Sequence, residues 1–168
     1  MLIYHPAFDP YHCAFRGMRI LGILEGLDIE VDSFRIGDFY ILFPGLIVQM
    51  KLPRDLLKWR SHFSEAKNPY HFSGDQKIVF ERMRVFQLMG LRALAHNGII
   101  DETKLQKGAI VRGSRTCPEA LSEVVKKSNE REPDVINFLR DLFTKIPFRG
   151  VDGLKARSGL LEYKYDNV

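Results

Sequence analysis

The amino-acid sequence predicts a mainly α-helical fold with a small antiparallel β element. Apolar residues recur at helical spacing in most segments, whereas only two short stretches resemble strands. Of the 168 residues, 45% are hydrophobic and 27% are charged, a balance typical of a globular chain that buries a core. We expect a single domain over 1–168, with a helical part over 1–66, a loop over 67–75 and a second helical part over 76–168.

Local signals predict the first two helices. Asp9 is suited to cap the first helix and Pro10 to occupy its first position, where a missing N–H costs nothing. Gly26 can end this helix in a left-handed conformation. The next segment, 31–43, carries apolar residues nearly all round, which indicates a helix buried on most sides that ends before Pro44.

Proline, asparagine and glycine residues delimit the remaining helices. We expect a short helix that starts at Pro53 and a long helix over 76–96 that ends at Asn97-Gly98. Two further helices should follow, one from a capping box at Thr116–Glu119 and one from Pro133. Residues 109–112 and 160–165 are the strand candidates, and they are able to pair with each other. Together with the long helix, this pairing is compatible with a winged-helix-like unit over 76–165.

Nothing in the sequence favours a membrane protein or a secreted protein. The longest apolar run, 39–50, is broken by Pro44 and Gly45 and is shorter than the roughly 20 residues that a spanning helix needs. The N-terminus, MLIYHPAFDP, lacks the basic and apolar regions of a signal peptide. Two cysteines, Cys13 and Cys117, are too few for a disulfide framework. We therefore expect a cytoplasmic protein without membrane contact.

Charge is distributed unevenly along the chain. Residues 1–50 hold three basic groups against six acidic ones, and residues 51–168 hold 22 against 15. This asymmetry is compatible with a nucleic-acid face, with an acidic partner or with ordinary solvated helices. The candidate contacts to a DNA backbone are Arg112, Arg115, Lys126, Lys127 and Arg131. The last three lie near a predicted helix C-terminus, where positive charge is also favourable without DNA.

The densest group of reactive side chains is His5, Asp9, His12 and Cys13, and residues of these types can bind zinc. The arrangement argues against a metal site, because Asp9 is better used as a helix cap. The sequence also lacks a glycine-rich phosphate loop of either common pattern. We therefore predict no catalytic residue, metal or cofactor. A small enzyme or metalloprotein centred on His5, Asp9 and His12 remains an alternative hypothesis.

Arg35 and Asp38 lie three residues apart in the most apolar predicted helix, where a charge is costly unless it is paired. One interpretation is an ion pair within the helix at the edge of the core. The other is a contact to a partner subunit through the face that carries Phe39 and Tyr40. Neither charged residue is a catalytic candidate, because no nucleophile or second acid lies nearby in the sequence.

Three segments together resemble a known protein family. IYHPAFDPYHCAFR at 3–16, RIGDFYILFP at 35–44 and GVDGLKARSGLLEYKYD at 150–166 are similar to the middle components of bacterial ABC three-component systems. Proteins of this family are encoded between an SMC/RecF-like ATPase and an effector. Gly37 departs from the family pattern, in which a larger apolar residue is expected, and it lowers helix propensity.

The resemblance implies a role in Lamassu-type defence against phages or plasmids. The chain would be a non-catalytic adaptor that joins the SMC/RecF-like ATPase to a nuclease-type or other effector and holds the effector inactive until foreign DNA ends are sensed. The family-like segments supply the candidate partner interface, which is Arg35, Asp38, Phe39, Tyr40, Asp9 and Arg16. The alternative function is that of a winged-helix DNA-binding transcriptional regulator.

Overall fold

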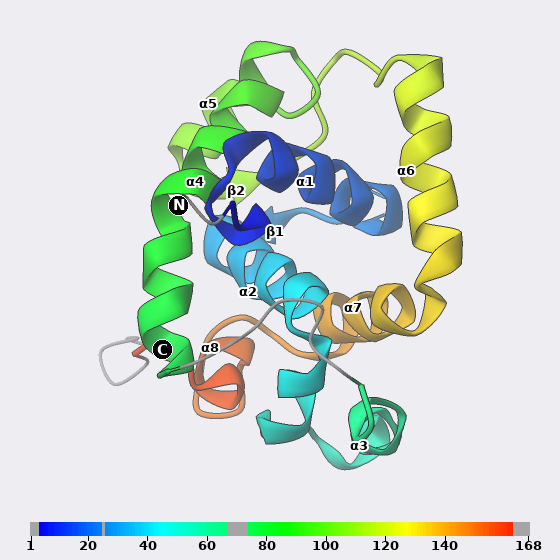
Figure 1. Ribbon diagram of the computed structural model, residues 1–168. Coiled ribbons are helices and arrows are strands. Elements are labelled where there is room, and N and C mark those ends of the chain that lie inside the picture. The colour runs from blue at the N-terminus through cyan, green and yellow to red at the C-terminus, as the bar shows by residue number, and fades with distance from the viewer. Residues whose placement is uncertain (1–3, 25, 67–73, 163–168) are drawn as a thin grey trace.

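The computed structural model describes residues 4–24, 26–66 and 74–162. Helices α1 (Pro10–Leu24) and α2 (Val31–Leu42) lie in the middle of the molecule, with α4 (Gln76–His96) on one side and α6 (Glu119–Arg131) on the other (Figure 1). The only sheet in this part of the chain is a pair of two-residue strands. The predicted fold class, mainly helical with a small antiparallel β element, is therefore confirmed.

The N-terminal helices begin and end where the sequence predicts. A 3-10 turn, Pro6–Phe8, precedes α1. The backbone N–H groups of Tyr11 and His12 donate to Asp9 Oδ1 at 2.8 and 2.9 Å, so Asp9 caps α1 as expected. Gly26 has a φ of 90° just beyond the helix end. In α2 every residue from 33 to 42 is buried, which agrees with its nearly all-apolar sequence.

The remaining helices are the 3-10 helices Pro44–Gln49 and Arg54–Leu56, and the α-helices α3 (Lys58–Phe63), α5 (Glu102–Gln106), α7 (Pro133–Lys145) and α8 (Leu154–Ser158). The helical segments that follow Pro53 and begin at Pro133 match the predictions, whereas Pro44–Gln49, α5 and α8 were not predicted. The long helix α4 has the predicted bounds, 76–96. The predicted capping box at Thr116–Glu119 is wrong, because Pro118 occupies the N-cap position of α6 and no side chain caps the helix. Most of the predicted loop, 67–73, lies outside the described residues.

Among the described residues, the strand pairing differs from the predicted one. Strand β2 (Ala109–Ile110) pairs antiparallel with β1 (Ile29–Glu30), and Ile29 lies opposite Ile110. Residues 160–162 form no strand, and 163–165 lie outside the described residues. Because Ile29 and Ile110 are both buried, this pairing joins the N-terminal helices to the second half of the chain through the core. The described part of 76–165 thus does not show the strand pairing on which the winged-helix-like unit was predicted.

Gly37 is explained by the packing of α7 against α2. A Cβ atom at Gly37 would lie 2.6 Å from Cζ of Phe143, which is shorter than real contacts of this kind. The Phe143 ring therefore occupies the space that a larger residue at position 37 would need.

Within the described segments, no helix combines the length and the apolar character needed to cross a membrane.

Candidate functional site

Charged residues predicted at a partner interface form a buried polar network inside the protein. Arg16 on α1 and Asp38 on α2 are 4% and 0% exposed. Arg16 donates from Nε and Nη2 to the two carboxylate oxygens of Asp38 at 2.5 and 3.2 Å. Gln87 on α4 donates from Nε2 to Asp38 Oδ2 at 2.8 Å. The carboxylate accepts three hydrogen bonds, which offset its removal from water.

Arg35 extends the buried polar network toward α4. Its Nε donates to Gln87 Oε1 at 3.0 Å, and its Nη1 donates to Asp32 Oδ1 at 2.8 Å. Its guanidinium also lies 4.3 Å from the centroid of the Phe80 ring. The predicted ion pair between Arg35 and Asp38 is therefore wrong. Each charge finds its partner elsewhere, Arg35 one turn earlier in α2 and Asp38 on α1.

The sequence pattern does not predict the role of Gln87. Its side-chain amide accepts from Arg35 and donates to Asp38, which in turn binds Arg16. Gln87 is fully buried on the face of α4 that also carries Met83, Leu91 and Leu94. A polar residue within an apolar helical repeat is the signal that would have identified it, because such a residue needs a partner in the interior.

The other candidate interface residues also have roles inside the chain. Phe39 and Tyr40 are 0% and 1% exposed, and the Tyr40 ring lies 6.1 Å from that of Phe138 in an edge-to-face arrangement. Burial raises the pKa of the Tyr40 phenol. Asp9 lies at the start of α1, where the hydrogen bond from the His12 N–H lowers its pKa. Partner contact through these residues stays a prediction, and Phe39 and Tyr40 expose no aromatic surface for it.

The group of reactive side chains near the N-terminus is arranged for structure. His5 Nδ1 accepts a hydrogen bond from the Ala7 N–H at 3.1 Å, and burial, together with the nearby Arg16 charge, lowers the pKa of His5. Burial also raises the pKa of the Cys13 thiol to about 12. Among the residues that the structure describes, no three His, Cys, Asp or Glu side chains are placed together to hold a metal ion.

We expect Cys13 to resist alkylation in the native protein. Only the thiolate reacts, and a pKa of about 12 leaves a fraction on the order of 10⁻⁴ ionised at pH 8. The test is iodoacetamide labelling of a Cys117→Ser variant, followed by mass spectrometry. Labelling should require denaturant, since Cys13 is 1% exposed. Native labelling as fast as that of the unfolded chain would contradict this expectation.

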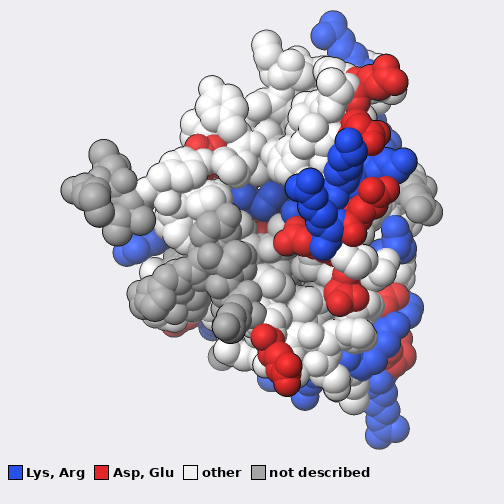
Figure 2. Space-filling view, turned by 45° about the vertical axis from the view of Figure 1, so that its right-hand side comes forward, with Lys and Arg blue, Asp and Glu red and all other residues white. Residues whose placement is uncertain are grey.

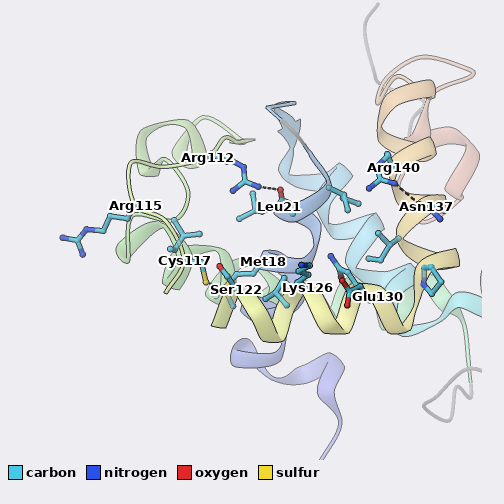
Figure 3. Close-up of a pocket in the computed structure, with 17 residues that line it drawn as sticks. Met18, Leu21, Arg112, Arg115, Cys117, Ser122, Lys126, Glu130, Asn137 and Arg140 are labelled. Carbon is cyan, nitrogen blue, oxygen red and sulfur yellow. Dashed lines mark hydrogen bonds between the residues drawn. The ribbon is translucent and has the colours of Figure 1, made fainter. Parts of the chain in front are cut away.

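A second site, the basic groove, lies between α1, α6 and α7 and has a volume of about 420 Å³ (Figure 3). Its basic residues are Arg112, Arg115, Lys126 and Arg140, and its apolar residues are Met18, Leu21, Ile23, Ile99, Val125 and Ile136. Glu130 is the one acidic side chain among the described residues that line it. The surface on the α6 side carries basic and acidic side chains next to each other (Figure 2).

The basic groove brings together part of the predicted DNA-contact set. Arg112, Arg115 and Lys126 line it, whereas Lys127 and Arg131 do not. Arg112 Nη2 donates to the backbone oxygen of Leu21 at 2.5 Å, so it also holds the last turn of α1. The Arg115 side chain points away from the other labelled residues (Figure 3). Lys127 Nζ lies 3.7 Å from Oε1 of Glu123. DNA contact through these residues stays a prediction.

Arg19, which the sequence does not single out, attaches α6 to α1. Its Nε donates to Asn129 Oδ1 at 2.9 Å, and its Nη2 donates to Glu132 Oε2 at 2.6 Å. Asn129 Nδ2 donates in return to the backbone oxygen of Arg19 at 3.2 Å. Val125 is the one buried residue of α6. Polar contacts therefore carry much of the attachment of this helix, and no local signal predicts them because the partners are more than 100 residues apart.

The fold and the two sites define a small helical protein whose buried charges serve packing and whose surface carries a basic groove. The model of the family described as ABC-three component (ABC-3C) system Middle Component 5 matches residues 2–166, and the chain belongs to this family. It is thus a middle component of a system that has further components, as the resemblance implied. No curated protein and no solved structure matches the chain.

Proposed function

We propose that this middle component is a non-catalytic adaptor in a Lamassu-type defence system. It would join an SMC/RecF-like ATPase to a nuclease-type or other effector, and would keep the effector inactive until foreign DNA ends are sensed. The observation that carries the proposal is the family match over residues 2–166, because it accounts for nearly the whole chain as a middle component.

Two separate surfaces support a bridging role. On one side of the molecule, Ile78, Val85 and Met89 are large exposed apolar residues of α4, and their spacing places them on one face of that helix. On the other side lies the basic groove beside α6. Helix α1 lies between α4 and α6 (Figure 1). An adaptor needs independent surfaces for its two partners, and exposed apolar faces are typical of such surfaces.

The test is co-expression of the tagged chain with its two neighbouring gene products. We expect a single assembly that contains an ATPase and is much larger than the 19.4 kDa chain, with its mass measured by multi-angle light scattering. The chain purified alone should hydrolyse neither ATP nor DNA. Recovery of the chain as a lone 19.4 kDa species in the presence of both neighbours would contradict the adaptor function.

A further inference from the structure

The basic groove combines an aliphatic floor with a cationic rim. Its apolar residues come from α1, α6, α7 and the segment between α4 and α5, and its lining includes four basic residues against Glu130. Lys126 and Arg140 are both exposed on neighbouring helices. A volume of about 420 Å³ is large enough to receive several side chains of a ligand, and lies within the usual range of binding pockets. An occupant should therefore carry apolar groups and negative charge together.

The lining of the basic groove favours a protein segment over single-stranded nucleic acid. Proteins that bind single-stranded nucleic acids stack the bases on aromatic side chains. Among the described residues that line this groove, none is aromatic, and the apolar ones are aliphatic or Met. Such a surface suits the aliphatic side chains of a peptide, and the basic rim suits carboxylates that flank them.

Helix α6 forms one wall of the basic groove and has few buried contacts with the rest of the protein. It buries only Val125 of its 13 residues, and its groove side carries Val125 among the polar residues Ser122, Lys126, Asn129 and Glu130. Its contacts with Arg19 lie toward its C-terminal end, at Asn129 and in the following Glu132. An occupant of the groove would therefore add apolar contacts to a helix that has few of its own.

We propose that the basic groove binds a segment of another component of the system, in which aliphatic residues are flanked by Asp or Glu. The inference rests on the proposed adaptor function and names the chemistry of one of its partners. The aliphatic side chains would cover the floor, and the carboxylates would pair with Lys126 and Arg140 at the rim. Arg112 would stay on the Leu21 backbone oxygen and add positive charge beside them.

The first test reverses the charge of the rim in the full chain. The variant Lys126→Glu/Arg140→Glu is titrated against the co-purified complex of the other two components. The matched control is Lys104→Glu/Lys107→Glu, which changes the same net charge at exposed residues outside the basic groove. At low salt we expect binding at least about tenfold weaker for the groove variant alone, with the difference reduced in about 0.5 M salt because rim charges are screened.

The outcomes separate this inference from the proposed function. Failure of the wild-type chain to bind the other components would overturn the adaptor function and, with it, this inference. Wild-type binding that the groove variant matches would overturn the inference alone, as would an equal loss in the control. Circular dichroism should show that both variants keep the wild-type helix content.

The second test identifies the occupant. A photo-crosslinking amino acid replaces Ser122, an exposed residue of α6 that lines the groove, in the assembled complex. We expect crosslinks to one segment of a partner component that is rich in aliphatic and acidic residues. The same label at Thr103 on α5 should not reach that segment. Crosslinks from position 122 to DNA, or to a basic segment, would overturn the proposal.

Discussion

The variant Asp38→Asn should be less stable than the wild-type protein by about 3–5 kcal/mol, because it leaves the buried Arg16 guanidinium without its negative partner. Arg16 is 4% exposed and cannot turn to water without moving α1. For a chain of 168 residues, a loss of this magnitude lowers the melting temperature by about 6–20 °C. Thermal and urea unfolding followed by circular dichroism measure the effect.

The matched control for this variant is Asp32→Asn, the same chemical change on the same helix. Asp32 pairs with Arg35, but its side chain is 40% exposed and Arg35 keeps its hydrogen bond to Gln87. We expect a loss of at most about 1 kcal/mol there. Equal effects of the two substitutions would show that burial of the Asp38 charge does not determine the cost.

A double variant separates the charge pair from the surrounding packing. Adding Arg16→Met to Asp38→Asn removes the unpaired cation, and the side-chain carbonyl introduced at position 38 still offers an acceptor to the amide of Gln87. The double variant should therefore be more stable than Asp38→Asn alone, because replacing both charges is less costly than leaving one unpaired. A double variant with the summed loss of its two single variants would argue against direct coupling.

Local signals in the sequence are sufficient for much of the helical fold. Asp9 accepts hydrogen bonds from backbone groups two and three residues away, so the start of α1 is encoded within a single turn. Gly26 and Gly98 have positive φ just after α1 and α4 for a similarly local reason. The apolar character of 31–43 likewise indicates a buried helix without reference to its neighbours.

The polar network and the strand pairing depend on contacts between distant segments. Asp38 pairs with Arg16 across 22 residues, and Gln87 reaches Asp38 across 49. Nothing near Asp38 in the sequence distinguishes this pairing from a bond to Arg35 within α2. Ile29 meets Ile110 for the same kind of reason, since the pairing depends on which segments share the core. The sequence thus identifies which charges are costly to bury, and the fold decides how they are paired.

Dependence on distant contacts also explains why the candidate binding surface lies beside α6 and not on α2, where the sequence predicted it. The apolar sequence around Arg35 and Asp38 is equally compatible with a core helix and with a partner-binding face. In the structure, Arg35, Asp38, Phe39 and Tyr40 are all buried, as in a core helix. The basic residues of the second half were predicted as DNA contacts from charge alone, and three of them line one groove. Its aliphatic floor comes partly from α1, which no pattern around Lys126 indicates.

Gly90→Ala should destabilise the protein by about 1–3 kcal/mol, because α1 passes directly over this position of α4. A Cβ atom at Gly90 would lie 2.9 Å from the backbone N of Ala14, the backbone O of Pro10 and the Cβ of Cys13. Two of these atoms belong to the backbone, so the clash is relieved only if α1 and α4 separate. This cost outweighs the gain in helix propensity of about 1 kcal/mol that alanine brings.

Gly22→Ala is the control, and we expect it to change stability in the opposite direction. Gly22 also lies within a helix, but a Cβ atom there would meet only Asn129 Nδ2, at an ordinary contact distance of 3.6 Å. The gain in helix propensity should therefore remain, and the variant should be more stable by about 0.5–1 kcal/mol. Urea unfolding of both variants measures the difference. Stabilisation by Gly90→Ala would mean that α1 and α4 are not in contact at this position.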